Sequence, residues 1–244
     1  MRVPRLLLDG PLAAGERELE SEAAHYLVSV LRRRPGDALR VFDGAGTSAD
    51  ARVLLAERRR CVISLDPPFA EQVESPLAVH LGIALSRGER MDVALQKACE
   101  LGVHAITPLF TERTEVRLEG KRLDNRMRHW GEVLRHATQQ SGRTVLPALH
   151  APLSLDAHLR ARGEVPGFVM DPSGRPLAAL APGASARAHL LTGPEGGFSE
   201  GELSAADALG WLRLATGPRV LRAETAPIVG LALLQAVWGD LDGT

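Results

Sequence analysis

From residue 76 onward, apolar side chains switch between two spacings, and this alternation constrains the fold more than any other feature of the sequence. Residues 77–85 alternate apolar with smaller or more polar side chains, which predicts a strand with one better-buried face. Residues 91–101 repeat apolar side chains at helical spacing, and Gly102 is the residue type that commonly ends a helix. Strands and helices in alternation favour a largely parallel sheet covered by helices on both faces.

The alternation continues to the end of the chain. An amphipathic helix of about five turns is predicted over residues 123–137. Ser199 and Glu202 match a capping box, which predicts a helix start, and a final helix is expected from Thr225 to just before Gly239. Three short apolar runs are predicted as buried strands, at residues 105–110, 167–170 and 188–192.

The first seventy residues have a different pattern, with short apolar runs separated by turn residues. Strands are predicted at residues 38–42, 51–55 and 61–65, and a helical turn at residues 25–31. Residues 66–76 are proline-rich and acidic, and have no periodicity, which is typical of a linker. We therefore expect a small β-barrel-like domain over residues 1–70 and a larger α/β domain over residues 76–244.

The charge balance is close to neutral, with 29 basic and 30 acidic side chains. A nucleic-acid-binding protein is often strongly basic, so such a function would require local clusters such as Arg32 to Arg34. Cys61 and Cys99 stand apart, with no CxxC pair or Cys/His cluster, which argues against a disulfide scaffold or a metal site and favours a reducing cytoplasm. No apolar run is long enough to cross a membrane.

Several common chemistries lack their sequence signatures. The chain contains no GxxxxGK[ST] phosphate loop, no HExxH metal helix, no GxSxG nucleophile elbow and no GxGxxG between a strand and a helix. ATP hydrolysis by a phosphate loop, metalloprotease activity, hydrolase chemistry and Rossmann dinucleotide binding are therefore not supported.

A glycine-rich turn joins a predicted strand to the capped helix. Residues 190–192 lead directly into Gly193-Pro194-Glu195-Gly196-Gly197. Glycines at the carboxyl end of a buried strand let backbone groups approach a ligand, and ligands of open α/β sheets bind at that end. A turn that needs glycine for its backbone angles alone is the alternative.

A second turn repeats this arrangement before the last helix. Residues 212–214 lead into Gly217-Pro218-Arg219, and residues 220–226 continue with the sequence VLRAETA. Arg222 and Glu224 place opposite charges next to the turn, which suggests a polar pocket. The alternative for these two residues is a structural ion pair at a helix N-terminus.

These two segments resemble the bacterial 16S ribosomal RNA (uracil-N3) methyltransferase family of the SPOUT superfamily, and the resemblance covers essentially the whole chain. Both turns together with the upstream motifs make it strongly specific. The motifs are SRGERM at 86–91, QK at 96–97, ELGV at 100–103, QQSGR at 139–143, GPEGGFS at 193–199 and GPRVLRAETA at 217–226.

The resemblance implies a fold that periodicity could not show. In the family, the larger domain is Rossmann-like and its C-terminal portion is tied into a trefoil knot, a feature so rare that sequence reasoning alone would reject it. The smaller domain is a PUA-like RNA-binding β-barrel. The resemblance also implies S-adenosylmethionine as the cofactor and a homodimer with the sites at the interface.

The resemblance also assigns cofactor-binding residues, at the positions of this chain that match the family's motifs. For the cofactor they are Met170, Leu191, Gly193, Glu195, Gly196, Gly197, Leu214, Gly217, Val220 and Leu221, with Asp171 beside Met170 in a third wall. Arginines that we expect to contact RNA phosphates because of their positive charge are Arg32, Arg33, Arg34, Arg87, Arg126 and Arg128. Arg222, between the cofactor turn and the last helix, is our candidate for stabilising an anionic uracil. No histidine or cysteine has the context of a general base.

The implied activity is transfer of a methyl group to N3 of a uridine in 16S RNA. The near-neutral charge favours an assembled small subunit over free RNA as the substrate. Two alternatives remain: a knotted methyltransferase that modifies a tRNA base, and a ribosome assembly factor whose pocket no longer binds a cofactor. The QQSGR segment and the N-terminal β-rich domain argue against the tRNA alternative, and the intact glycines argue against the assembly factor.

Overall fold

The structure, a computed structural model, describes residues 3–57, 60–116, 118–180 and 185–241. Its contacts divide the chain into two compact units, residues 1–74 with 138–146, and residues 75–137 with 147–244. The return of residues 138–146 to the first unit was not expected from the sequence, which had assigned them to the larger domain.

Glu74 explains why residues 138–146 belong to the first unit. Its carboxylate accepts hydrogen bonds from the backbone N–H groups of Thr144 and Val145, each at 3.0 Å. Arg143 forms an ion pair with the other carboxylate oxygen at 2.7 Å. The side chain of Gln139 accepts a hydrogen bond from the backbone of Leu7 at 2.9 Å. These side-chain contacts join positions far apart in the sequence, so periodicity could not predict them.

The first unit is a β-sheet with one helical segment, as predicted. Its strands pair in the order β1-β3-β4-β5-β2, with β6 on β4, and all pairs except β1 with β3 are antiparallel. The strands are β1 (Arg5–Leu7), β2 (Gly15–Glu18), β3 (Ala38–Phe42), β4 (Thr47–Ala56), β5 (Cys61–Leu65) and β6 (Phe69–Ala70). A short helix, α1 (Ser21–His25), continues into one π-helical turn over Tyr26–Val30. Closure of this sheet into a barrel stays a prediction.

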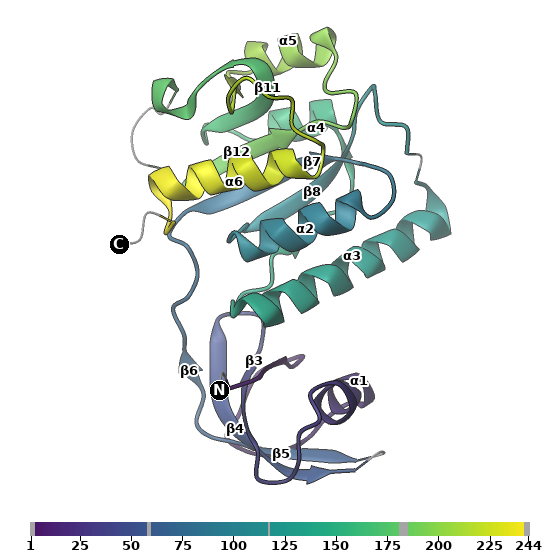
Figure 1. Ribbon diagram of the computed structural model, residues 1–244, viewed down its shortest axis with the longest axis vertical. Helices are drawn as coiled ribbons and strands as arrows, with labels where there is room; N and C mark the ends of the chain where they lie inside the picture. The colour runs from purple at the N-terminus through teal and green to yellow at the C-terminus, as the bar shows by residue number, and fades with distance from the viewer. Residues whose placement is uncertain (1–2, 58–59, 117, 181–184, 242–244) are drawn as a thin grey trace. The chain divides into compact units, whose positions relative to one another are not determined.

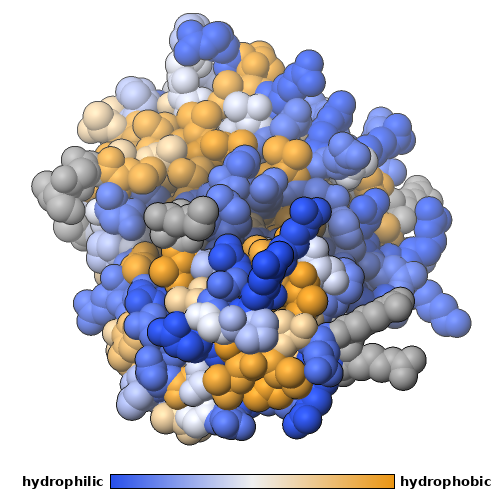
Figure 2. Space-filling model, turned by 60° about the horizontal axis from the view of Figure 1, so that its bottom comes forward, coloured by the Kyte–Doolittle hydropathy of each residue, from blue (hydrophilic) through white to orange (hydrophobic). Residues whose placement is uncertain are grey.

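The core of the first unit comes from the apolar face of the sheet and the helical segment. Leu27, Val41 and Ile63 are fully buried there. Hydrophobic surface on the face shown in Figure 2 occurs in separate areas between hydrophilic residues. Val30, Leu54 and Phe69 are exposed apolar side chains of this unit, and single exposed apolar residues are common on folded proteins.

The second unit is built on a sheet in which every pair is parallel, as the strand–helix alternation predicts. Its strand order is β10-β8-β7-β12-β11-β13, with β9 on β8. The strands are β7 (Ala78–Ala84), β8 (Ala105–Phe110), β9 (Ala148–Leu149), β10 (Leu153–Ser154), β11 (Gly167–Arg175), β12 (Arg187–Thr192) and β13 (Leu212–Leu214). Parallel sheets are buried on both faces, which matches the fully buried residues along β7 and β12.

Helices cover both faces of this sheet (Figure 1). One face carries α2 and α6, which contact each other, and the other carries α4 and α5, which also contact each other. The helices are α2 (Arg90–Glu100), α3 (Gly120–Ser141), α4 (Leu155–Ala161), α5 (Glu200–Ala208) and α6 (Thr225–Trp238), with a 3-10 turn at Leu177–Ala179. The predicted stop of α2 at Gly102 (φ 78°) and the capping box of α5 are confirmed.

α6 lies close to the sheet because Gly230 has no side chain. A Cβ at this position would be 2.8 Å from Leu190 Cδ2 in β12 and 3.0 Å from Met170 Sδ in β11. The end of β11 also approaches β13 closely. The ladder with Leu214 is interrupted between Met170 and Arg175, and a Cβ at Gly174 would be 2.5 Å from the backbone of Arg213. The trefoil knot itself stays a prediction.

No helix in the described part of the chain is both long enough and apolar enough to cross a membrane. Cys61 and Cys99 are buried, one in each unit, and they form no disulfide.

Three histidine rings lie together within the second unit. The ring centroid of His80 is 5.1 Å from that of His158 and 4.9 Å from that of His189. Burial, followed by repulsion from neighbouring imidazoles, lowers the pKa of His80 to about 3 and that of His158 to about 4. Burial, followed by the nearby charge of Arg162, lowers the pKa of His189 to about 4. The folded protein therefore holds these rings neutral.

The histidine cluster should make the protein sensitive to acid. The unfolded chain binds protons at these rings from about pH 6.5 downward, whereas the folded chain resists them until about pH 4. The stabilising contribution is therefore complete above pH 6.5 and is lost as the pH falls toward 4, by up to about 1.4 kcal/mol for each histidine per pH unit. Urea unfolding at pH 7.5, 6.0 and 5.0 measures this loss. The variant His158→Leu should show a shallower slope, and an identical slope would contradict the assignment.

The candidate cofactor pocket

One pocket lies at the carboxyl ends of β11, β12 and β13. Parallel strands end at the same edge of a sheet, and this is where open α/β sheets bind ligands. The pocket has a volume of about 380 Å³, within the usual range for small-molecule sites. Its walls are residues 170–172 of β11, beyond the last residue paired with β12, residues 193–195 and Gly197 after β12, and residues from Leu214 at the end of β13 to Ala226 in α6.

The first glycine-rich turn starts directly after the buried Thr192. Gly197 has a φ of +66°, and its backbone N–H donates to the carbonyl of Pro194 at 2.9 Å. Ser199 then caps α5, because its side chain accepts from Glu202 N–H and the Glu202 carboxylate accepts from Ser199 N–H. The guanidinium of Arg113 stabilises the turn by donating a hydrogen bond to the carbonyl of Gly196 at 2.7 Å. The turn is thus held in place by β12 on one side and by α5 on the other.

The second turn positions Arg222 at the start of α6. Gly217 has a φ of +101°, and the chain then lines the pocket up to Ala226. The carbonyl of Arg222 accepts hydrogen bonds from the N–H groups of Thr225 and Ala226 at 2.9 and 3.0 Å. This fixes the backbone of Arg222, while its side chain remains 81% exposed. Val220 is 85% exposed, which is unusual for an aliphatic side chain beside a pocket.

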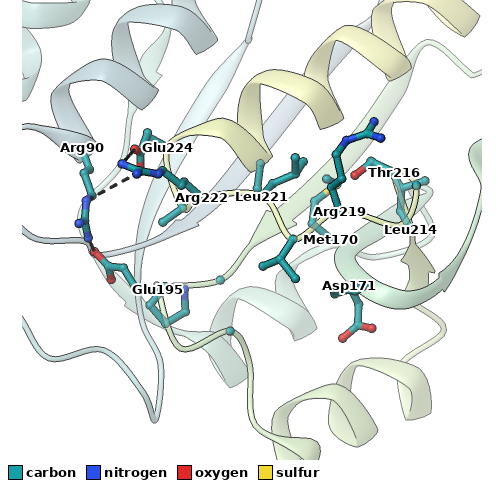
Figure 3. Close-up of a pocket in the computed structure, with 18 residues that line it drawn as sticks. Arg90, Met170, Asp171, Glu195, Leu214, Thr216, Arg219, Leu221, Arg222 and Glu224 are labelled. Carbon is teal, nitrogen blue, oxygen red and sulfur yellow. Dashed lines mark hydrogen bonds and ion pairs between the residues drawn. The ribbon is translucent and has the colours of Figure 1, made fainter.

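Charged side chains gather at one end of the pocket, and mostly apolar residues with Asp171 and Arg219 lie at the other (Figure 3). We call the group Arg90, Glu195, Arg222 and Glu224 the charged end. Arg90 forms ion pairs with both glutamates of this group: its Nη1 is 2.5 Å from Glu195 Oε1, and its Nε is 3.9 Å from Glu224 Oε2. Arg222 Nη1 lies 3.9 Å from Glu224 Oε1. Burial acts to raise the pKa of Glu195, but hydrogen bonds from its own backbone and from Arg90 outweigh it and hold the pKa below the usual range.

A second, more open hollow of about 840 Å³ shares Arg90 and Glu195 with the pocket. Its other walls are the segment before α2, including Arg87, and the segment after β8, including Arg113. Arg87 is 67% exposed and forms an ion pair with Glu115 at 2.9 Å. Both hollows therefore open at the carboxyl edge of the sheet, with the Arg90–Glu195 pair between them.

The structure brings most of the predicted cofactor residues into this pocket. Eight of them line it together with Arg222: Met170, Gly193, Glu195, Gly197, Leu214, Gly217, Val220 and Leu221. Leu191 does not line it, because its side chain is 1% exposed and packs in the core beneath. Gly196 lines the second hollow instead.

Sequence reasoning missed Arg90 as a pocket residue. Arg90 begins α2, far from both turns in the sequence, and only the pairing of β7 with β12 places it beside Glu195. Its presence in the SRGERM motif was the available signal. Glu224, for which the sequence left both a polar pocket and a structural ion pair open, lines the pocket. Among the described residues, no group of three or more His, Cys, Asp or Glu side chains could hold a metal ion.

The predicted RNA-binding arginines lie outside the pocket. Arg32 and Arg34 are exposed and Arg33 is half-buried, in the turn after the helical segment of the first unit. Arg32 has a φ of +52°, a left-handed conformation uncommon for non-glycine residues. Arg126 and Arg128 are on α3, half-buried and exposed respectively.

Two family models match the chain. Residues 73–235 match the RNA methyltransferase domain, and residues 19–66 match the RNA methyltransferase PUA domain. Among curated relatives, a protein named ribosomal RNA small subunit methyltransferase E from Synechocystis sp. is 33% identical, covering 90% of this chain and 72% of its own length. A protein of the same name from Buchnera aphidicola subsp. Schizaphis graminum is 30% identical, and the similarity covers 98% of this chain and 98% of that protein.

Two solved structures are similar over nearly their whole length. Ribosomal RNA small subunit methyltransferase E from Neisseria gonorrhoeae, bound to S-adenosyl methionine, is 33% identical with a TM-score of 0.91, over 98% of this chain and 99% of that one. A methyltransferase from Legionella pneumophila, in complex with the same cofactor, is 34% identical with a TM-score of 0.93, over 99% and 100% of the two chains.

Gly197 should be the more sensitive of two adjacent glycines in the first turn. The variant Gly197→Ala places an L side chain at φ +66°, which costs about 1–2 kcal/mol although the space is open. Gly196→Ala is the matched control, because its Cβ would make an ordinary contact with Arg113 at 3.4 Å. Chemical denaturation of both variants measures the difference. Equal stabilities would show that the conformation of Gly197 does not constrain this turn.

Proposed function

Because this chain belongs to the ribosomal RNA small subunit methyltransferase E family, we propose that it transfers a methyl group from S-adenosylmethionine to uracil N3 of a uridine in 16S ribosomal RNA. The observation that carries the proposal is the pocket at the carboxyl edge of the sheet, formed by both glycine-rich turns and by residues 170–172 of β11.

The chemistry of the pocket fits this cofactor. Its volume of about 380 Å³ suits a molecule of that size. Met170, Leu214 and Leu221 supply apolar surface for adenine, and the two turns expose backbone groups for its hydrogen bonds. The carboxylate of Glu195 complements a cationic ligand, and the pKa of that carboxyl group is held low. When bound, the cofactor supplies an electrophilic methyl group on a positively charged sulfur.

The protein's own task is to position the base and to stabilise charge. Methyl transfer requires in-line geometry, so the target base must be held close to the methyl donor, at roughly 3 Å. Loss of the N3 proton leaves negative charge on the uracil, which a nearby cation stabilises. Arg222 is our candidate for this role, because its backbone is anchored at the start of α6 and its side chain is exposed at the charged end.

Replacement of Arg222 should separate catalysis from cofactor binding. We expect Arg222→Ala and Arg222→Lys to lower the methylation rate by about 10² or more, because a preorganised charge stabilises the transition state. Cofactor affinity measured by calorimetry should stay within about threefold, which corresponds to a change of roughly 0.7 kcal/mol or less in the free energy of binding. An equal loss of rate and affinity would instead make Arg222 a structural or cofactor-binding residue.

RNA binding is proposed for the arginines named from the sequence. Arg32, Arg34 and Arg128 expose their side chains, and arginines of this kind contact phosphates and position an RNA without reading its sequence. The target uridine would have to leave its stack to reach the pocket. With a formal net charge of −1, the chain is not expected to bind free RNA strongly, which favours the assembled small subunit as the substrate.

A methylation assay tests the substrate and the reaction together. Purified protein and cofactor carrying a labelled methyl group are incubated with small subunits, free 16S RNA or tRNA, and the nucleosides are then identified by mass spectrometry. We expect 3-methyluridine, formed faster in small subunits. Label in tRNA would favour the alternative of a tRNA-modifying enzyme. Faster labelling of free RNA would contradict the preference for the subunit, and no heat of cofactor binding would favour an assembly factor.

A homodimer is proposed because α6 leaves apolar surface uncovered. Val237 is 51% exposed and Val220 is 85% exposed, while Ile228, Val229 and Leu233 are only half-buried. A second copy would cover this surface and bring its own residues toward the pocket. The two free, buried cysteines fit a reducing cytoplasm as the place of action.

The uncovered face of α6 should control the oligomeric state. The variant Val237→Glu introduces a charge on this face, and burial of an unpaired charge costs several kcal/mol. We expect light scattering to show a dimer for the wild type and a monomer for this variant. Val73→Glu is the matched control, because Val73 is 42% exposed in the first unit. A monomeric wild type, or dissociation by both variants alike, would contradict the proposal.

A further inference from the structure

One carboxylate oxygen at the charged end has no hydrogen-bond donor within the described part of the chain. Glu224 lines the pocket with 19% of its side chain exposed. Its Oε2 atom is buried and makes no hydrogen bond. A buried acceptor without a donor destabilises the fold, and here it lies at a position where a ligand could provide the missing donor.

Two guanidinium groups flank this carboxylate without satisfying it. Arg90 Nε is 3.9 Å from Oε2, and Arg222 Nη1 is 3.9 Å from Oε1. Both distances exceed that of a hydrogen bond. Arg90 is also anchored to Glu195 at 2.5 Å, and Arg222 is 81% exposed. Figure 3 shows Glu224 with Arg90 and Arg222 beside it. The three side chains form a donor–acceptor–donor row that small side-chain movements would open to a ligand.

This row is complementary to one edge of uracil. Uracil presents the N3–H donor between the O2 and O4 carbonyl acceptors, so that a carboxylate faces the N–H and a guanidinium faces each oxygen. Cytosine presents an unprotonated N3 acceptor and an amino donor at the same edge. A carboxylate opposite cytosine N3 would bring two acceptors together and leave both unpaired, which strongly disfavours binding.

We propose that Glu224 recognises the N3–H of the target uracil and accepts its proton during methyl transfer. This inference rests on the proposed function and deepens it, because it assigns the proton acceptor and the reason for choosing uracil. Arg90 and Arg222 are the flanking donors. Arg90 is a positioning residue that also connects Glu224 to the cofactor turn through Glu195.

In the proposed reaction, Glu224 takes the N3 proton and the cofactor supplies the methyl group. The N3–H bond breaks and its proton moves to the Glu224 carboxylate. The electron pair left on N3 forms the new bond to the methyl carbon, and the bond between that carbon and sulfur breaks with its electrons remaining on sulfur. The products are a neutral N3-methylated base and a neutral thioether. The proton on Glu224 passes to water once the product leaves, which restores the carboxylate.

The variant Glu224→Gln tests the proton transfer. Its amide oxygen can still accept from N3–H, but it cannot take the proton at neutral pH. We expect the methylation rate at pH 7.5 to fall by about 10² or more, the usual contribution of a general base. Cofactor affinity measured by calorimetry should stay within about threefold. The residual rate should rise about tenfold per pH unit between pH 7 and 9, because hydroxide then removes the proton.

A more acidic base should rescue the variant. RNA transcribed with 5-fluorouridine carries a more acidic N3–H, so Glu224→Gln should regain at least about tenfold in rate while the wild type gains less. Glu224→Asp, which keeps a carboxylate, should retain an intermediate rate without the steep pH dependence. Glu164→Gln is the matched control, an exposed glutamate in the turn after α4, and it should match the wild type in every assay.

A purely structural role gives a different result. If Glu224 only anchors the start of α6, Glu224→Gln should lower cofactor affinity or thermal stability, and 5-fluorouridine should not restore the rate. That result, or a rate equal to that of the wild type, would overturn the assignment of Glu224 alone. If the wild type forms no 3-methyluridine, the proposed function fails and this inference fails with it.

Discussion

Parallel pairing of β12 with β7 on one side and β11 on the other is the interaction on which the pocket depends. Because the strands of each pair run in the same direction, their carboxyl ends lie at the same edge of the sheet. Residues 170–172 of β11 and the turn after β12 meet there, and the pairing of β11 with β13 adds the third wall. A shift of one residue in this register would move each side chain of β12 to the opposite face of the sheet. The geometry of the site therefore depends on this register.

Close helix–sheet packing follows from the same arrangement. Gly230 allows α6 to lie against Leu190 and Met170, so the start of the helix, and Arg222 with it, is held at a fixed distance from the strand ends. Because folded interiors are close-packed, a larger residue at this position would move the helix rather than compress the sheet. The position of the reactive groups thus depends on a residue that makes no polar contact with a ligand.

The charges of the pocket are not arranged for stability. An ion pair with a side chain as exposed as that of Arg222 contributes little to folding, and the separation of 3.9 Å from Glu224 forms no hydrogen bond. By contrast, the Arg90–Glu195 contact at 2.5 Å fixes one arginine against the cofactor turn. The charged end thus holds one tight pair and two loose ones, and Glu224 and Arg222 are less constrained than Arg90.

The sequence by itself determined the order and type of the main elements of the second unit, because strand and helix periods are local properties. It also placed both glycine-rich turns at strand ends, and the resemblance named eight residues that line the pocket. Only the tertiary structure decided that Arg90 and Glu224 meet there, that Leu191 is buried beneath the pocket, and that residues 138–146 join the first unit through Glu74. Those outcomes depend on which strands pair and on contacts between distant positions, and no local spacing in a single sequence records them.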